Sequence, residues 1–105
     1  MATMQAQFRV GQLVHHKLFD YRGVIIDVDP GFMGADEWYR TMARSRPPKD
    51  KPWYHVLVHN AVHQTYVAEQ NLDPDPSGDP VIHPDIDDYF EGFRAGIYLS
   101  RQSMN

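Results

Sequence analysis

The sequence contains no cysteine. Disulfide bridges, thiolate metal sites, iron–sulfur clusters and a cysteine nucleophile are therefore excluded together, and the absence fits a reducing compartment. No apolar run approaches the roughly 20 residues that cross a bilayer, and the first residues lack the basic and then apolar order of a secretion signal. We therefore expect a cytoplasmic protein that does not associate with a membrane.

Motifs of covalent catalysis and phosphate binding are also missing. The serines fall in expected loops or in the tail and none lies in a GxSxG motif. The glycines at 31 and 34 lack both a Walker lysine and a GxGxxG layout. Asp27 and Asp29 share a face of an expected strand and could form an acid/base pair, but a solvated surface explains them better. We expect no catalytic residues, no cofactor and no enzymatic activity.

Six histidines raise the question of a metal site. His55, His59 and His63 are spaced by four residues, which would align them on a helix. His55 and His59 instead fall on one expected strand, about 13 Å apart at ~3.3 Å per residue, which is too far for one ion to bind directly. His15 and His16 alternate faces of another strand. The histidine spacing therefore predicts no metal site.

Charge is distributed unevenly along the chain. Residues 1–51 carry 8 Lys/Arg and 6 Asp/Glu, a net +2, whereas residues 52–105 carry 2 and 8, a net −6. Five basic residues cluster between 40 and 51, and they are the candidate DNA-phosphate contacts because phosphate binding needs grouped cations: Arg40, Arg44, Arg46, Lys49 and Lys51. A solvated surface loop explains the same run equally well.

Four segments have the residue pattern of β-strands: 8–16, 21–29, 53–59 and 63–69. In the second, Val24, Ile26 and Val28 alternate with Ile25, Asp27 and Asp29, which is typical of a half-buried strand. In the third, Tyr54, Val56 and Val58 alternate with Trp53, His55 and Leu57. Asn60 and Ala61 then offer a short turn, so the third and fourth strands should form a hairpin.

The connection over residues 31–52 is long enough to suggest a function. Asp36 can cap a short helix that runs to about Arg44, and Pro47-Pro48 would then begin an extended, mobile stretch. After the fourth strand, residues 73–80 are rich in Pro, Asp and Gly and predict irregular surface chain. Apolar residues at helical spacing predict a C-terminal helix over residues 84–99: Ile86, Tyr89, Phe90, Phe93 and Ile97.

These elements predict one mostly β domain over residues 1–105. A small SH3-like antiparallel barrel over about 7–83, preferred to an OB-fold, would close its sheet and limit exposed edges, with the C-terminal helix beside it. Aromatic residues outside the strands are candidates for a partner-binding surface: Trp38, Tyr39, Tyr89, Phe90 and Phe93. Packing of Trp38 and Tyr39 against the barrel explains this pair better.

Four motifs taken together resemble the HspQ heat-shock protein family, which is also called YccV-like or hemimethylated-DNA-binding. They are FRVGQLVHH at 8–16, GVIIDVDP at 23–30, PWYHV at 52–56 and TYVAEQNL at 65–72, and the resemblance covers about residues 8–90. It implies an SH3-like barrel, a cytoplasmic bacterial stress protein that self-associates, and one of two roles. These are modulation of Lon protease specificity through protein contacts, or binding of hemimethylated DNA in replication control.

Between these two roles the sequence favours a protein partner. The net charge of −4 opposes DNA binding, and reading one methyl group would require base-edge contacts in the major groove from a longer helix than residues 36–44 offer. The basic residues at 40–51 lie outside the four matching motifs. Whether the chain forms a homo-oligomer stays open at this point.

Overall fold

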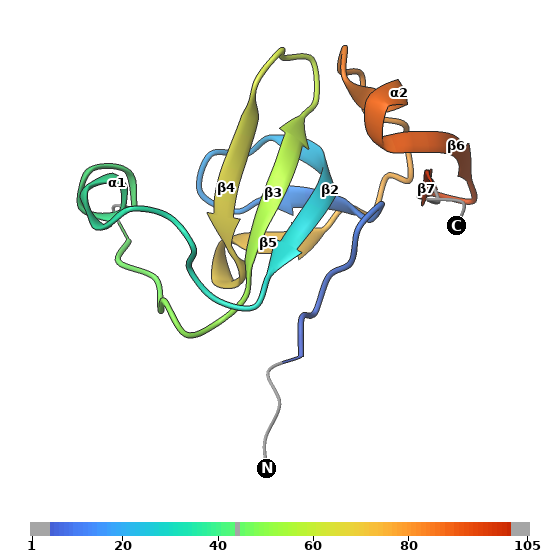
Figure 1. The fold of residues 1–105 in the computed structure, drawn as a ribbon. Coiled ribbons are helices and arrows are strands. Elements are labelled where there is room, and N and C mark those ends of the chain that lie inside the picture. Colours follow the sequence, from blue (N-terminus) through green and yellow to red (C-terminus); the bar gives the residue numbers. More distant parts are fainter. Residues whose placement is uncertain (1–4, 44, 102–105) are drawn as a thin grey trace.

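One antiparallel sheet of five strands forms the centre of the molecule in the computed structural model, which describes residues 5–43 and 45–101 (Figure 1). The strands are β1 (Leu13–His16), β2 (Arg22–Asp29), β3 (Trp53–Val58), β4 (Gln64–Ala68) and β5 (Leu72–Pro74). Their order is β4-β3-β2-β1-β5, and a 3₁₀ turn, η1 (Glu69–Asn71), joins β4 to β5. The predicted mostly β class and the β3–β4 hairpin are confirmed.

The sheet has two edges, β4 and β5. Within the part of the chain that the structure describes, these edge strands pair only with β3 and β1, respectively, and not with each other. The expected closed barrel is therefore not found. Each edge strand therefore keeps backbone N–H and C=O groups that can pair with a strand of another chain.

A β-bulge in β2 sets which side chains face each side of the sheet. Ile25 lies opposite Val56 and Asp27 lies opposite His55, so Ile26 is the extra residue. The extra residue reverses the side-chain alternation, and Ile25 and Val28 consequently contact the same hydrophobic cluster. The prediction that Val28 would share a face with Val24 and Ile26, and Ile25 with the aspartates, is wrong for this reason.

Hydrophobic residues form two core clusters on opposite faces of the sheet. The inner face carries Tyr54 and Val56 of β3 in a cluster with Phe8, Val14, Ile25, Val67 and Leu72. The outer face carries Trp53, His55 and Leu57, and Leu57 packs with Leu13, Val24, Val81, Phe90 and Tyr98. The predicted alternation along β3 is therefore confirmed, with apolar residues buried on both faces.

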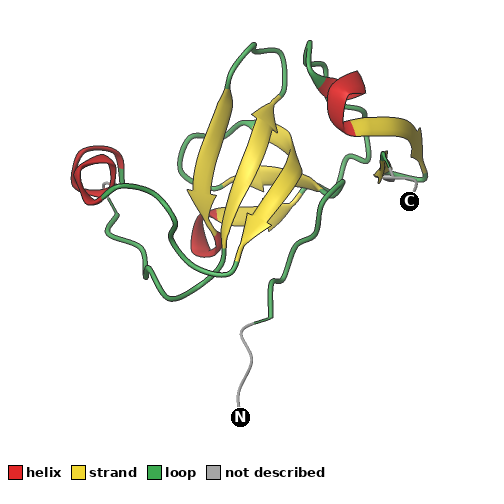
Figure 2. Cartoon of the chain, viewed as in Figure 1, coloured by secondary structure: helices red, strands yellow, loops and turns green. Residues whose placement is uncertain are grey.

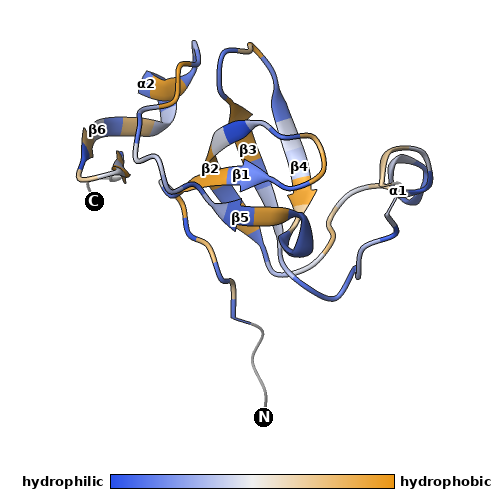
Figure 3. Cartoon of the chain, turned by 180° about the vertical axis from the view of Figure 1, so that it is seen from behind, coloured by the Kyte–Doolittle hydropathy of each residue, from blue (hydrophilic) through white to orange (hydrophobic). Residues whose placement is uncertain are grey.

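The long connection between β2 and β3 contains the expected short helix, α1 (Asp36–Met42). This helix and its flanking loops lie beyond β4 on one side of the sheet, and the C-terminal elements lie on the opposite side (Figures 1 and 3). Acidic Asp36 and Glu37 occupy its first turn, which the helix dipole favours. The helix exposes most of its residues, so tertiary packing rather than its own length must hold it.

The predicted C-terminal helix over 84–99 is wrong. One helical turn, α2 (Ile86–Tyr89), is followed by a hairpin of β6 (Phe90–Arg94) and β7 (Ile97–Ser100), as Figure 2 shows. Ala95 and Gly96 both have positive φ, 54° and 79°, which is the backbone of a two-residue hairpin turn. The hairpin directs Phe90 and Tyr98 into the core cluster of the outer face, and burial of these rings outweighs the helical spacing.

No helix among residues 5–43 and 45–101 is both long and apolar enough to cross a membrane.

Candidate functional site

Five aromatic side chains gather on the outer face of the sheet, and we call them the aromatic cluster: Phe32, Trp38, Tyr39, Trp53 and Tyr66. Trp53 is buried at its centre, with ring centroids 4.9 Å from Phe32 and 5.2 Å from Tyr66. Because Phe32, Trp38 and Tyr39 come from the long connection, the cluster fastens this connection to β3 and β4.

Hydrogen bonds hold the same connection near the sheet. The Tyr39 hydroxyl donates to the Pro47 carbonyl at 2.6 Å, and the Trp53 indole N–H donates to the Pro48 carbonyl at 3.1 Å. Pro47 itself is fully buried. The expected extended, mobile stretch at Pro47-Pro48 is therefore instead a packed and hydrogen-bonded segment.

An apolar groove lies between α1, β4 and the turn that joins β1 to β2, and we call it the β4 groove. Its volume is about 360 Å³. Three of its lining side chains are large, apolar and well exposed: Leu18 at 58%, Phe19 at 69% and Met42 at 60%. Apolar surface that is exposed around a concave site is typical of surfaces that bind other molecules.

The groove follows the open edge of β4. Thr65 and Val67 from the inner face and Tyr66 and Ala68 from the outer face all line it, as does Gln64. The amides of Val58 and Glu69 bond to the His63 and Pro52 carbonyls, respectively, so the odd-numbered residues of this strand pair with β3. By the same alternation, Gln64, Tyr66 and Ala68 direct their backbone N–H and C=O groups away from β3, toward the groove.

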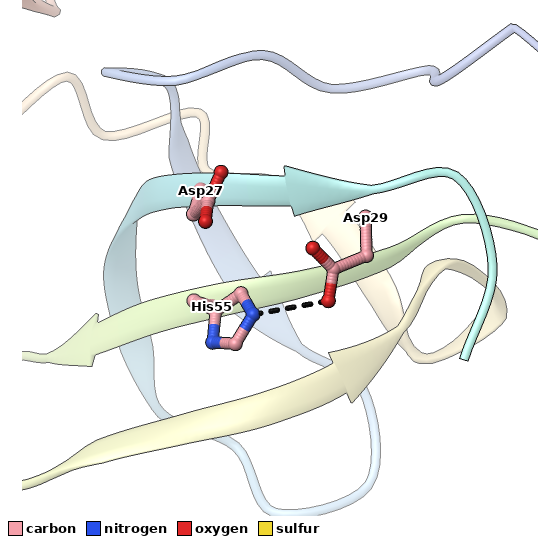
Figure 4. Close-up of side chains that lie close together, drawn as sticks. All are labelled: Asp27, Asp29 and His55. Atoms are coloured by element: carbon pink, nitrogen blue, oxygen red, sulfur yellow. Dashed lines mark hydrogen bonds and ion pairs between the residues drawn. The ribbon is translucent and has the colours of Figure 1, made fainter. Parts of the chain in front are cut away.

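A polar cluster on the outer face consists of Asp27, Asp29, His55 and Tyr66, of which His55 and Tyr66 also line the groove. Figure 4 shows the two aspartates and His55. Asp29 Oδ2 accepts a hydrogen bond from the Tyr66 hydroxyl at 2.6 Å and lies 3.2 Å from His55 Nε2. The Tyr66 hydroxyl in turn accepts the Met33 amide N–H at 2.9 Å. The His55 ring packs on the Tyr66 ring with centroids 4.5 Å apart.

The surroundings of Tyr66 favour its neutral form. Burial, followed by the hydrogen bond to the Asp29 carboxylate, raises the pKa of Tyr66 from 10.0 to about 12. At neutral pH the hydroxyl is therefore a fixed donor, and it orients Asp29 rather than exchanging protons. The polar cluster can accept hydrogen bonds, attract a cation or provide ligands for a metal ion.

The chain matches a protein-family model described as hemimethylated DNA-binding protein YccV-like over residues 6–97. It belongs to the YccV-like family. Curated relatives include F-box only protein 21 of Homo sapiens, Mus musculus and Pongo abelii, each 32% identical over 99 residues. Those alignments cover 92% of this chain but only 16% of each relative, so the YccV-like chain corresponds to a small part of them.

The match to the family model contains both the β4 groove and the polar cluster. The expected YccV-like membership is confirmed, whereas the narrower resemblance to HspQ stays a prediction.

The basic candidates of this YccV-like chain differ in their surroundings. Arg40, Arg46 and Lys51 are exposed, and Arg44 lies outside the described residues. Lys49 is engaged with its own loop: its Nζ lies 4.4 Å from the centre of the Tyr39 ring and 3.2 Å from Asp36 Oδ1. This cation contributes to the packing of the connection, a role that the sequence did not predict.

The aromatic partner-binding candidates divide between two places. Trp38 and Tyr39 pack in the aromatic cluster, as preferred from the sequence, and Trp38 also lines the β4 groove. Phe90 is a buried core residue, and Phe93 is half-buried against the same core. Tyr89 alone of the C-terminal set is well exposed, at 37%.

Leu18, Phe19 and Met42 are groove residues that the sequence analysis missed. A signal was present, because Leu18-Phe19 is an apolar pair in the connection between the first two predicted strands, where polar residues are usual. The polar cluster was missed for another reason: grouping His55 with Asp27 requires the register of β2 against β3, which includes the bulge.

Proposed function

We propose that this YccV-like chain is a non-enzymatic binding module that docks an extended, apolar segment of a partner protein in the β4 groove. The observation that carries the proposal is the coincidence of an apolar groove with the open edge of β4. A bound segment would add to the sheet as a sixth strand, pairing with the backbone groups of Gln64, Tyr66 and Ala68. Main-chain hydrogen bonds of this kind supply affinity, and alternate side chains supply specificity.

The chemistry of the groove indicates what kind of segment it accepts. Tyr66 and Ala68 from the sheet and Trp38 and Met42 from α1 offer apolar surface along its length, and Leu18 and Phe19 offer apolar surface at its rim. Burying the exposed part of such side chains contributes about 25 cal/mol per Å² of apolar area. A segment with large apolar residues at alternate positions is therefore the expected ligand.

A partner of this kind agrees with the role that resemblance to HspQ implies, which is modulation of Lon protease specificity. The net charge of −4 also suits a protein partner better than a nucleic acid. We therefore place the contact with Lon, or with a substrate delivered to Lon, in the β4 groove.

The proposal is tested by measuring degradation of a reporter substrate by Lon with and without this protein. The variant L18S/F19S removes two exposed, adjacent apolar side chains of the β4-groove rim, and we expect it to lose the modulating effect by about tenfold or more. The matched control is V62S/I82S, which removes two apolar residues of comparable exposure, 79% and 65%, that do not line the groove. Equal behaviour of the two double variants, or no effect of the native protein on Lon, would refute the proposal.

The family description favours a second candidate function, binding of hemimethylated DNA. The exposed cations Arg40, Arg46 and Lys51 are the groups available for phosphate contacts. If they contact phosphates, retention of a hemimethylated duplex should weaken with salt and should weaken further in the variant R40A/R46A/K51A. Retention that is absent at low salt, or that the variant leaves intact, would exclude this second function.

A further inference from the structure

Three side chains of types that can bind metals lie close together on the outer face of the sheet, although none of them are adjacent in the sequence. Asp27 and Asp29 of β2 and His55 of β3 each place a donor atom within 4.8 Å of the other two (Figure 4). We propose that these three side chains form a binding site for a divalent transition-metal ion such as Zn²⁺ or Co²⁺. This inference is independent of the proposed function in the β4 groove.

The fold brings these three groups together through the bulge in β2. Because Ile26 is the extra residue, Asp27 becomes the direct cross-strand neighbour of His55, and Asp29 follows on the same face. Without the extra residue, Ile26 would stand opposite His55, and Asp27 would turn to the inner face. Bulges recur beside functional sites because they redirect a side chain in this way.

Two of the three groups are already positioned by neighbours. The Tyr66 hydroxyl donates a hydrogen bond to Asp29 Oδ2 at 2.6 Å, and it accepts a hydrogen bond from the Met33 amide N–H. The Tyr66 ring supports the His55 ring. Metal ligands are typically oriented by such second hydrogen bonds, and Tyr66 is accordingly a positioning residue of the site.

The donor set determines the class of ion. One imidazole nitrogen with two carboxylate oxygens suits Zn²⁺ and its first-row neighbours, whereas Mg²⁺ and Ca²⁺ prefer oxygen ligands alone. Bonds of about 2.0–2.2 Å require the donor atoms to approach to roughly 3.3 Å of one another. The Asp27 side chain is exposed and its Oδ1 accepts the Val28 amide N–H at 2.9 Å, which leaves Oδ2 to make that approach.

Space for the remaining ligands of the ion is present. A hollow of about 450 Å³ adjoins two of the three side chains, Asp29 and His55, and its other lining residues are Tyr66, Trp38 and residues 33–35. Three protein ligands and an open position define a site that can also hold water or an outside ligand. The proposed site therefore lies at the surface and is accessible from solvent.

The two tryptophans report on metal binding. The ring centroids of Trp53 and Trp38 lie 5.2 and 5.7 Å from the Tyr66 ring, which is in turn packed on His55. Co²⁺ bound at the site should quench their fluorescence in a saturable way, and Zn²⁺ should compete with it. Calorimetry with Zn²⁺ should give one ion per chain.

The variants D27N, D29N and H55A should each weaken binding of Co²⁺ by about tenfold or more, while circular dichroism shows that they remain folded. D27N is the most informative of them because Asp27 is exposed and its replacement spares the packing. H15A is the matched control, since His15 also pairs with an aspartate, its Nε2 lying 2.6 Å from Asp20 Oδ1. Quenching that does not saturate in excess metal, that survives in D27N and H55A, or that disappears in H15A would overturn the proposal.

Discussion

At the scale of single residues, the hydroxyls of Tyr54 and Tyr66 each join segments that are distant in the sequence through hydrogen bonds. Tyr66 connects the aromatic cluster, the polar cluster and the 33–35 turn through one hydroxyl. Tyr54 does the same on the inner face, where its hydroxyl donates to Glu69 Oε2 at 2.5 Å and accepts the Phe8 amide at 3.3 Å. Both groups are stable as donors because their surroundings disfavour ionisation.

Replacing Tyr66 with phenylalanine should change how stability depends on alkaline pH. The pKa of Tyr66 is raised to about 12 in the folded state, so the folded protein binds this proton more tightly than the unfolded chain does. Its contribution is complete below pH 10.0 and is lost as the pH rises to about 12. The free energy of unfolding, measured in urea across this pH window, should therefore fall less steeply with pH in Y66F than in the native protein. An equally steep fall in both would contradict the assignment.

Replacing Tyr54 with phenylalanine should destabilise the protein at neutral pH. The Phe8 amide and Glu69 would both lose the buried hydroxyl, and a buried polar group left unpaired costs about 1–3 kcal/mol. Equilibrium unfolding in urea measures the difference. A loss of only a few tenths of a kcal/mol would show that water replaces the hydroxyl.

At the scale of elements, the sequence predicted β2, β3 and β4 closely, placed β1 inside a longer strand at 8–16, and missed β5, β6 and β7. The alternation of Trp53, His55 and Leu57 with Tyr54 and Val56 is a local property, and β3 has the predicted faces. The bulge at Ile26 is not a local property, because β2 is apolar on both faces before it and an alternating pattern cannot show an extra residue. The grouping of Asp27 with His55 was unpredictable for the same reason.

The C-terminal segment shows a second limit of the pattern. Phe90 and Phe93 are three residues apart, which fits a helix, but Ala95-Gly96 forms the turn of a hairpin. Burial of Phe90 and Tyr98 in the core, rather than the local spacing of apolar residues, determined that this segment forms a hairpin. A turn with positive φ at alanine carries no signal in the sequence as strong as an Asn-Gly pair would.

Gly11 joins the sheet to the C-terminal hairpin, and its replacement with alanine should be severely destabilising. Its φ is +92°, and a Cβ there would lie 2.2 Å from the Tyr98 carbonyl oxygen. We expect the free energy of unfolding to fall by about 2 kcal/mol or more, because the steric clash and the backbone strain act together.

Gly78 provides the matched control for Gly11. It also has positive φ, +70°, but a Cβ there would meet no atom within 4 Å. G78A should therefore lower the free energy of unfolding only by the cost of a positive φ at alanine, about 1 kcal/mol. Thermal unfolding of both variants makes the comparison, and equal losses would contradict the close contact at Gly11.

At the scale of the whole molecule, the proposed binding surface and the C-terminal hairpin lie on opposite sides of the sheet. The hairpin completes the core on one side, and α1 and its flanking loops lie on the other, as Figure 1 shows for these elements. Side chains of α1 and of the loop after it line the β4 groove. The basic candidates come from the same connection as α1, and Lys49 packs on the Tyr39 ring within it. The sequence drew attention to this connection through its length and its charge, whereas the described groove is lined there by Trp38, Met42, Ala43, Ser45 and Pro47.

Hydrogen exchange of the backbone amides in the presence of Lon tests the central claim most directly. In the free protein the amides of Gln64 and Tyr66 face the β4 groove rather than β3, so we expect them to exchange readily. Docking of an extended segment should slow exchange at these two positions and leave the β6–β7 hairpin unchanged. Binding accompanied by protection of residues 40–51 instead, with the β4 edge still exchanging freely, would contradict the account.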